Sequence, residues 1–224
     1  MTGKDQAPAA RGGLFVTLEG CDGCGKTTQL GLLQDALARE GHDVLRLREP
    51  GGTPISEAIR ALLLDPAHAE MAPECELLLF EASRAQLVRE RIEPALAAGQ
   101  VVLCDRFYDS TTAYQMAARG LDAEQVHRAN ELGSCGVTPD LTLVLDLDPG
   151  VALARATGAG ADRMEGEGAA FQAKVRAAFL DLAEREPQRV RLVDADVAPA
   201  QVHERVLGLV HAALASRATE GLRP

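Results

Sequence analysis

Short apolar runs alternate along the chain with longer segments of helical periodicity. The runs are rich in valine and leucine and predict buried strands. They lie at residues 14–18, 44–47, 101–105, 141–146 and 190–193. Strands separated by helices favour a mainly parallel sheet covered on both faces. The pattern therefore predicts a three-layer α/β/α fold around a mostly parallel five-stranded sheet.

The helical segments are marked by apolar stripes and by breakers. Helices are predicted over a stripe at 28–37, from Pro54 to a break at Asp65-Pro66, over 74–97, after 105 through 116, and over 122–132, 149–156, 169–186 and 199–216. Ile55, Ile59, Leu62 and Leu63 form the expected apolar face of the second helix. In the third, Leu77, Phe80, Arg84, Leu87 and Val88 share one face, and Gly99 ends the helix.

Composition limits the kinds of partner. The 224 residues include 33 acidic and 23 basic ones, giving a net charge of −10. This acidity argues against nucleic-acid backbone binding, which needs a basic surface. No apolar run is long enough to span a bilayer. Five cysteines, an odd number, and the lack of a targeting signal favour free thiols and a cytoplasmic protein. We expect residues 1–12 to be a disordered tail and 13–224 one domain.

A glycine-rich motif follows the first strand. Gly20-Cys21-Asp22-Gly23-Cys24-Gly25-Lys26-Thr27 fits G-x-x-x-x-G-K-[ST], a phosphate-binding loop, and the helix that contains Thr28 follows it. The glycines let backbone N–H groups approach a phosphate. Lys26 can reach the β- and γ-phosphates, and the Thr27 hydroxyl can bind Mg²⁺. Strand, loop and helix together predict a site for a nucleoside triphosphate.

Three segments converge on this site. Gly20, Arg48 and Asp105 each follow a predicted strand, and ligands in parallel sheets lie beyond the carboxyl ends of the strands. An acid that ends such a strand commonly lies near the Mg²⁺, so Asp105 is a candidate metal residue, although it could merely cap the next helix.

The activity is less constrained than the ligand. The guanine-binding N-K-x-D signature is absent, since the only asparagine, Asn130, is followed by Glu131. A small-molecule kinase and a nucleotide-switched binding protein both remain open. A kinase needs a second substrate pocket and cations for two phosphate ends, which Arg48, Arg84, Arg106 and Arg163 can supply.

Four motifs together resemble the thymidylate kinases. They are residues 18–29 around the loop, Arg48-Glu49-Pro50-Gly51-Gly52-Thr53-Pro54-Ile55, Asp105-Arg106-Phe107-Tyr108-Asp109-Ser110-Thr111-Thr112-Ala113-Tyr114-Gln115, and Asp162-Arg163-Met164-Glu165. The likeness covers about Leu14 to Ala213, in the same order and spacing. It implies a nucleoside monophosphate kinase-like fold with a mobile lid at about 157–168. It also implies γ-phosphoryl transfer from ATP to dTMP, Mg²⁺ as cofactor and a homodimer packed through helices.

The resemblance also implies residue roles. Phe80 would stack on thymine and Arg84 would hydrogen-bond its edge. Arg48 and Arg106 would hold the dTMP phosphate, and Asp22 would lie near the sugar or the metal. The remaining substrate contacts would come from Glu49, Pro50, Ser110, Thr111, Tyr114 and Gln115. Lys26, Asp22, Arg106 and Arg163 would form the catalytic set, with Thr27 at the metal and Asp105 at the metal or the acceptor phosphate.

Each of these residues also has an ordinary structural explanation. Without the resemblance we would favour Phe80 as a core residue and Arg84 as a surface cation. Arg48 and Arg106 could form surface ion pairs. Asp22 could serve the turn, Tyr114 the core, and Thr111 and Gln115 the helix surface.

The chain departs from the family at two places. Some members carry a catalytic arginine in the phosphate loop, where this chain has Cys24, and the segment 157–161 lacks the basic residues that many bacterial lids carry there. Arg163, within a matching motif, is therefore predicted to supply the lid cation in preference to Arg155. Cys21 and Cys24 also form a C-x-x-C. Either they are small residues tolerated in the turn, or the loop favours a reactive thiolate and a reversible disulfide.

Overall fold

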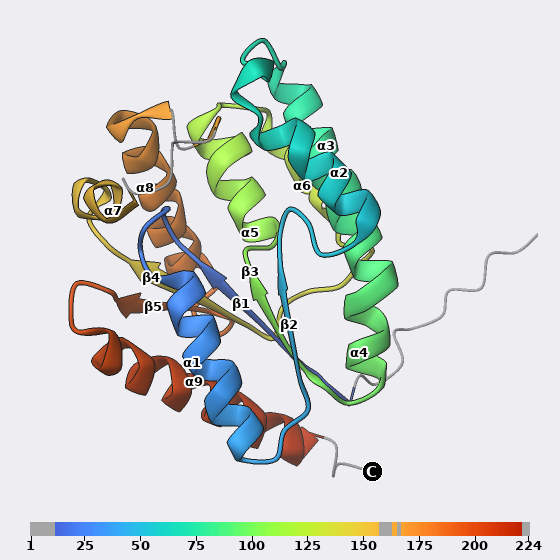
Figure 1. The fold of residues 1–224 in the computed structure, drawn as a ribbon, viewed down its shortest axis with the longest axis vertical. Helices are drawn as coiled ribbons and strands as arrows, with labels where there is room; N and C mark the ends of the chain where they lie inside the picture. Colours follow the sequence, from blue (N-terminus) through green and yellow to red (C-terminus); the bar gives the residue numbers. More distant parts are fainter. Residues whose placement is uncertain (1–11, 157–162, 165–166, 221–224) are drawn as a thin grey trace, which may run out of the picture.

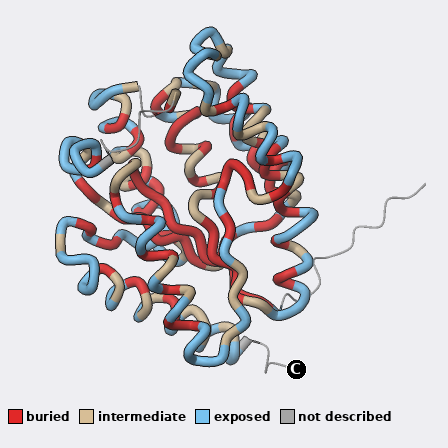
Figure 2. The backbone as a smooth tube through the Cα atoms, viewed as in Figure 1, coloured by how far each residue is buried: buried red, intermediate tan, exposed pale blue. Residues whose placement is uncertain are grey.

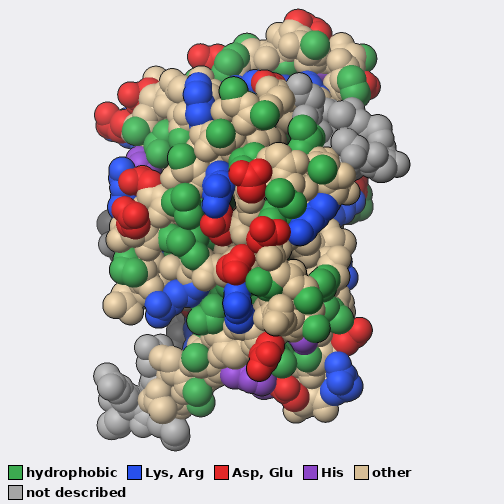
Figure 3. All heavy atoms as spheres, turned by 90° about the vertical axis from the view of Figure 1, so that its left-hand side faces the viewer, with side chains coloured by type: hydrophobic (Ala, Val, Ile, Leu, Met, Phe, Trp, Pro, Cys, Tyr) green, Lys and Arg blue, Asp and Glu red, His purple; other side chains and the backbone are tan. Residues whose placement is uncertain are grey.

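The structure is a computed structural model that describes residues 12–156, 163–164 and 167–220. The predicted tail at 1–12 lies outside these residues except for Gly12, as does most of the predicted lid. Within them, no helix combines the length and apolar composition needed to cross a bilayer. On the face shown in Figure 3, acidic and basic side chains are interspersed rather than gathered by sign.

A five-stranded, all-parallel sheet forms the centre (Figure 1). Its strands are β1 (Leu14–Glu19), β2 (Val44–Arg48), β3 (Val101–Asp105), β4 (Leu141–Asp146) and β5 (Val190–Asp194). They lie in the order β2-β3-β1-β4-β5. Leu18 pairs with Asp105, and Arg48 pairs with Asp105 from the other side. This register aligns the carboxyl ends of three strands at one edge, as predicted.

Helices cover both faces of the sheet, which confirms the three-layer prediction. They are α1 (Lys26–Arg39), α2 (Pro54–Leu64), α3 (Pro73–Leu87), α4 (Glu93–Ala97), α5 (Tyr108–Thr111), α6 (Ala123–Gly133), α7 (Pro149–Ala156), α8 (Ala169–Arg185) and α9 (Pro199–Glu220). A 3₁₀ turn at Pro66–His68 follows α2. Figure 2 shows the three central strands, β1, β3 and β4, buried along most of their length, whereas the edge strands β2 and β5 are partly exposed.

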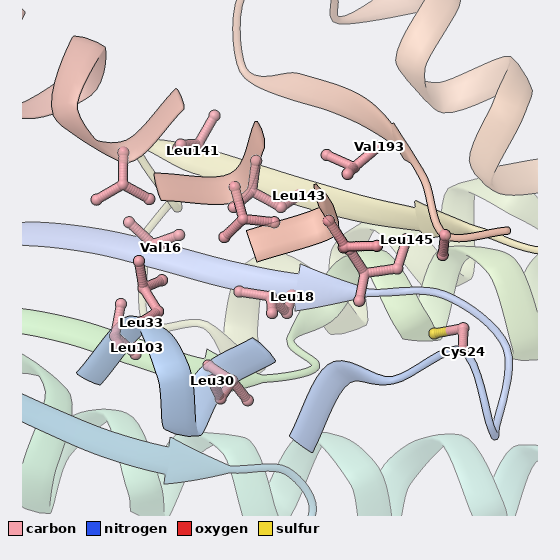
Figure 4. Packing of buried hydrophobic residues seen from close by; sticks show 14 of the residues in the cluster. Val16, Leu18, Cys24, Leu30, Leu33, Leu103, Leu141, Leu143, Leu145 and Val193 are labelled. Carbon is pink, nitrogen blue, oxygen red and sulfur yellow. The ribbon is translucent and has the colours of Figure 1, made fainter. Parts of the chain in front are cut away.

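Alternation along the strands divides the core between the two faces. Val16 and Leu18 of β1 point to α1 and α9 and pack with Leu30 and Val206 (Figure 4). Phe15 points to the opposite face, where it contributes to a cluster with residues of α3 and α4. The apolar side chains of β1 therefore meet an apolar layer on either face, which explains the apolar run, whereas Thr17 pairs with the hydroxyl of Thr142.

Two predicted helices differ in detail from the expectation. The helix predicted over 74–97 contains a π-helical segment, Val88–Ile92, and a second one, Thr112–Ala118, follows α5. Each π-helical segment is only 5 or 7 residues long, too short for a hydrophobic period to distinguish it from α-helix.

The predicted apolar face of α2 is wrong in part. Only Leu63 of that set is buried, whereas Ile55 is 56% and Leu62 47% exposed. Ser56 is buried instead, because its hydroxyl donates to the backbone oxygen of Ser83. Along α1, Thr28 and Leu32 of the predicted stripe are likewise exposed.

Candidate functional site

The phosphate-binding loop joins β1 to α1, as the motif predicts. Gly20, Gly23 and Gly25 all have positive φ, at 131°, 81° and 100°. A Cβ at Gly20 would lie 2.6 Å from the backbone oxygen of Leu145, so only glycine fits there. No side chain caps the start of α1. Its first N–H groups therefore remain available to an anion, which the helix dipole also favours.

Lys26 folds back over the loop. Its Nζ donates to the backbone oxygens of Gly20 and Cys21 at 3.1 and 3.0 Å, and the side chain is 8% exposed. Lys26 therefore packs against the loop backbone instead of standing free at the tip of the loop. The ammonium group is held at the inner edge of the cradle, where it can bind a phosphate with little loss of side-chain freedom.

Thr27 and Asp105 meet at the carboxyl edge of the sheet. Thr27 Oγ1 donates to Asp105 Oδ2 at 3.1 Å. A hydroxyl and a carboxylate are oxygen ligands of the kind that Mg²⁺ prefers, and an ion bound with nucleotide takes its other ligands from phosphates and water. This pair therefore fits the predicted metal position. Among the described residues no group of three acidic, histidine or cysteine side chains could hold a metal ion unaided.

Three adjoining cavities meet around the loop. The P-loop cavity, of ≈ 470 Å³, is lined by Asp22, Gly23, Gly25, Lys26, Thr27, Thr28, Arg48, Glu49, Arg60, Asp105 and Arg106. The outer cavity, of ≈ 410 Å³, shares Gly23, Gly25 and Thr28 with it and extends to Arg155 and Pro199. The inner cavity, of ≈ 100 Å³, shares Asp22, Glu49, Arg60 and Arg106 with it and extends to Phe80 and Gln115. The phosphate cradle thus lies between two side cavities.

Arg106 stands at the junction of the inner and P-loop cavities. It follows β3 in the left-handed region, with φ of 70°, which is uncommon for a residue with a side chain. Its guanidinium donates to Asp22 Oδ1 at 2.6 Å, to Ser110 Oγ at 3.0 Å and to the Tyr114 hydroxyl at 3.2 Å. Burial disfavours the charge of Asp22, but Arg106 and Lys26 outweigh it and lower the pKa of Asp22.

Arg84 forms the floor of the inner cavity. Its Nε donates to Glu49 at 2.8 Å, its Nη2 donates to Thr111 Oγ1 at 2.9 Å, and it pairs with Glu81. Its side chain is 2% exposed, so the alternative of a surface cation is wrong. Half-buried Phe80 lines the same cavity one helical turn earlier. The two residues therefore share one face of α3 toward the cavity, as their spacing predicts.

Two buried glutamates lie beside these arginines. Burial, partly offset by Arg106, raises the pKa of Glu19 to about 7. Glu19 accepts from the Phe107 N–H at 2.7 Å and the Ser110 hydroxyl at 2.6 Å. Burial also raises the pKa of Glu49 to about 7, against the opposing charge of Arg84. Glu49 lines both the P-loop and the inner cavities, and a perturbed acid in a cleft is typical of a functional site, whereas Glu19 is fully buried behind Arg106 and lines neither cavity.

The structure brings together most of the residues predicted as substrate contacts. Arg48, Glu49 and Arg106 line the P-loop cavity, and Glu49, Pro50, Phe80, Arg84, Arg106, Ser110, Thr111, Tyr114 and Gln115 line the inner one. Arg48 is 46% exposed and pairs with Glu57. Their roles toward a ligand stay predictions.

Sequence reasoning missed Glu19 and Arg60. Arg60 of α2 lines both the inner and the P-loop cavities and donates to the backbone oxygen of Pro50 at 2.9 Å. Arg60 was missed because it lies on a predicted helix for which the sequence analysis considered only the apolar face. Glu19 is the last residue of β1, the same position that drew attention to Asp105 on β3, and that signal could have identified it.

The two candidate lid arginines lie in different places. Arg163 Nη2 pairs with Glu76 at 2.6 Å, and its Nε donates to the backbone oxygen of Leu63 at 2.8 Å. It does not line the P-loop cavity. Arg155 lines the outer cavity and is 46% exposed, with longer contacts to Ala195 and Asp196. The assignment of the lid cation to Arg163 stays a prediction that requires Arg163 to leave Glu76, and the position of Arg155 beside Gly23 and Gly25 makes that residue its rival.

The two loop cysteines belong to the core. Cys21 and Cys24 are each 4% exposed and pack in the cluster beneath β1, and Figure 4 shows the Cys24 sulfur pointing toward that cluster. Burial raises the pKa of the Cys21 thiol to about 11. Of the two alternatives for this pair, burial therefore favours small residues tolerated in the turn over a loop-stabilised thiolate at Cys21, since desolvation outweighs the nearby cations.

Comparisons with known proteins agree on one family. The model of the family described as thymidylate kinase matches residues 18–206. A thymidylate kinase of Caldanaerobacter subterraneus is 47% identical over 198 residues, covering 88% of this chain and 95% of the relative, and one of Deinococcus radiodurans is 51% identical over 184 residues, covering 82% and 89%. The crystal structure of thymidylate kinase from Ehrlichia chaffeensis matches with a TM-score of 0.74 and 32% identity, covering 88% of this chain and 98% of that one.

Proposed function

We propose how three cavities divide the reaction of this chain, which belongs to the thymidylate kinase family and transfers the γ-phosphoryl group of ATP to dTMP. The outer cavity takes the ATP base and sugar, the P-loop cavity takes the triphosphate, and the inner cavity takes dTMP. The observation that carries this assignment is the junction at Asp22 and Arg106, which line both the P-loop and the inner cavities. A phosphate bound in the P-loop cavity and a phosphate bound in the inner cavity would therefore meet at this junction.

Transfer needs positioning and charge neutralisation rather than covalent help from the protein. An oxygen of the dTMP phosphate forms a bond to the γ-phosphorus, the bond to the β,γ-bridging oxygen breaks, and ADP leaves with that electron pair. Lys26 and the N–H groups of the loop hold the β- and γ-phosphates. Arg106, Arg48 and Arg60 hold the dTMP phosphate in line.

Thr27 and Asp105 would hold Mg²⁺, whose charge would help neutralise the β- and γ-phosphate oxygens. Their contact with each other and their place in the P-loop cavity support this role. In the inner cavity, Phe80 stacks on the thymine ring and Arg84 supplies N–H donors to its edge. Tyr114 packs beside the sugar, where a ribose 2′-hydroxyl would meet the ring.

One assay tests the reaction and its acceptor. Purified protein is supplied with ATP and Mg²⁺, each nucleoside monophosphate is offered in turn, and ADP release is followed. We expect dTMP to have the highest kcat/KM, with an advantage over dUMP of about 10–200-fold from burying one methyl group. Equal turnover of dTMP, dCMP and AMP would contradict the proposal.

We also propose that the protein is a cytoplasmic homodimer. Support for the dimer comes from exposed apolar side chains on three neighbouring helices, Ile55 and Leu62 on α2, Leu78 on α3 and Leu132 on α6. Leu78 is 64% and Leu132 79% exposed, and an apolar surface of this kind favours association.

Sedimentation at several concentrations tests the dimer. The Leu78→Lys, Leu132→Lys variant should be monomeric, whereas Leu192→Lys on β5, at a leucine that is 46% exposed and lies outside these helices, should leave the dimer intact. A wild-type protein that stays monomeric at every concentration would exclude the dimer.

A further inference from the structure

A buried carboxylate at the start of α3 holds several separate segments together. The side chain of Glu76 is 1% exposed. It accepts from Gln115 Nε2 at 2.8 Å, from Arg119 at 3.2 and 3.1 Å, and from Arg163 Nη2 at 2.6 Å. Burial disfavours its charge, but these hydrogen bonds outweigh that penalty and lower the pKa of Glu76. Glu76 is therefore ionised at neutral pH and can only accept hydrogen bonds.

This geometry fixes the orientation of the Gln115 amide. The NH₂ and the oxygen of an amide have nearly the same shape, so the neighbouring hydrogen bonds decide which one points where. Turning the amide over would place Gln115 Oε1 against the Glu76 carboxylate, and two acceptors would then face each other. The NH₂ must therefore face Glu76. Among the described residues, no group donates to Oε1.

Gln115 is a lining residue of the inner cavity and is 2% exposed there. With its nitrogen committed to Glu76, the amide presents an acceptor to a ligand in that cavity. Thymine and uracil carry an N–H donor at ring position 3, whereas cytosine carries an acceptor at the same position. An acceptor at Gln115 therefore favours the first two bases.

We infer that Glu76 is a positioning residue that selects imide-bearing pyrimidines by holding the Gln115 oxygen toward the base. Glu76 does not itself line the cavity and acts through Gln115. The inference rests on the proposed function, in that the acceptor base must occupy the inner cavity.

Glu76 also holds the segment with Arg163 and Met164, which forms the rim of the inner cavity. The test must therefore separate the effect of Glu76 on Gln115 from its effect on this rim. Arg163 contacts Glu76, and the next residue, Met164, lines the inner cavity. Arg119 bridges Glu76 to Glu167. Loss of the Glu76 charge would loosen this rim as well, and a looser rim would weaken every nucleotide rather than one base.

The experiment is the isosteric change Glu76→Gln, with kcat/KM measured for dTMP and dCMP. A glutamine at 76 can donate as well as accept, so the Gln115 amide is free to turn over. We expect the ratio of kcat/KM for dTMP to that for dCMP to fall about tenfold or more. The matched control is Glu167→Gln, which removes a charge from the same Arg119 without touching Gln115, and its ratio should equal that of the wild type.

A second background tests the route through Gln115. In Gln115→Met the amide is gone, so adding Glu76→Gln should leave the dTMP/dCMP ratio unchanged. A parallel fall for both nucleotides in Glu76→Gln, or a ratio change that persists in the Gln115→Met background, would overturn the inference. Thermal unfolding of each variant shows that the fold is retained.

A probe of the wild-type enzyme covers the case in which Glu76→Gln does not fold. The N3-methylated analogue of dTMP lacks the imide donor, and calorimetry should find that it binds at least tenfold more weakly than dTMP. Equal affinities would overturn the inference. Failure of the proposed function would look different, because the wild-type enzyme would then not prefer dTMP among the monophosphates at all.

Discussion

Arg106 Nη2 lies 2.6 Å from Asp22 Oδ1, joining the residue after β3 to the phosphate-binding loop after β1. The contact spans 84 positions in sequence, and it is made by an arginine in the left-handed conformation. Such backbone strain persists only where the surroundings fix it. Here the Arg106 N–H donates to the backbone oxygen of Leu18 at 3.0 Å, and the guanidinium hydrogen-bonds Asp22, Ser110 and Tyr114 and lies 3.9 Å from Glu19.

Replacing Arg106 by lysine should cost roughly 10²-fold in kcat/KM for dTMP. A lysine keeps the charge but loses the planar fork that contacts Asp22, Ser110 and Tyr114 together, and small errors in placing a reacting phosphate cost about this much. Steady-state kinetics with varied dTMP measures the loss. Arg176→Lys is the control, since Arg176 pairs with Asp146 through two nitrogens and lines none of the three cavities. Similar losses in both variants would mean that the fork of Arg106 has no special role.

Replacing Lys26 by alanine should lower kcat by roughly 10²–10³-fold or more, because charge that develops in transfer loses its main protein cation. The change also leaves two loop oxygens without their donor, so a small loss of thermal stability should accompany it. Lys26→Met fills the same space and should show the same kinetic defect. If either variant has native circular dichroism and a kcat within a few-fold of the wild type, the assigned role is wrong.

Much of the fold could be predicted because the sequence patterns that indicate its strands and its phosphate-binding loop are local. The runs at 101–105 and 141–146 coincide with β3 and β4, since valine and leucine between breakers favour a buried strand. The loop was predictable because only glycine fits a backbone such as that at Gly20. Nothing local marked Arg60 or Glu76, whose importance depends on partners from distant segments. The burial of Cys21 was also hidden, since the motif gives the loop path but not the side on which the core lies.

The stability of the protein should depend on pH through Glu19. Burial raises the folded-state pKa of this acid from its ordinary 4.5 to about 7, so the folded state binds the proton more tightly than the unfolded state does. The contribution of Glu19 to the free energy of unfolding is full below the unfolded-state pKa. It is lost as pH rises through the folded-state pKa. Between about pH 4.5 and 7 the contribution should fall by on the order of 1–3 kcal/mol.

Denaturant unfolding of the wild type and of Glu19→Gln across this range measures the effect. The glutamine cannot titrate, so the free energy of unfolding of the wild type should decline relative to the variant as pH rises. Asp22 and Glu76, whose pKa values are lowered, act in the opposite direction in both proteins and cancel in the difference. A constant difference across the range would show that Glu19 has an ordinary pKa.

The two candidate lid arginines should differ in the kinetic constant that they affect. Arg155 lines the outer cavity beside Gly23 and Gly25, and its contacts with Ala195 and Asp196, at 3.3 and 3.4 Å, are weak enough to exchange for a phosphate. Arg163 is engaged by Glu76 and Leu63. We therefore expect Arg155→Ala to lower kcat by several powers of ten, as loss of a transition-state cation does. Arg163→Ala should mainly raise the KM for dTMP, because it loosens the rim that carries Met164.

Kinetics with dTMP varied at saturating ATP, and then with ATP varied at saturating dTMP, separates the effect on kcat from the effect on KM. A larger kcat loss in Arg163→Ala than in Arg155→Ala would instead assign the lid cation to Arg163, as its motif predicts. Arg163 would then have to leave Glu76 during the reaction.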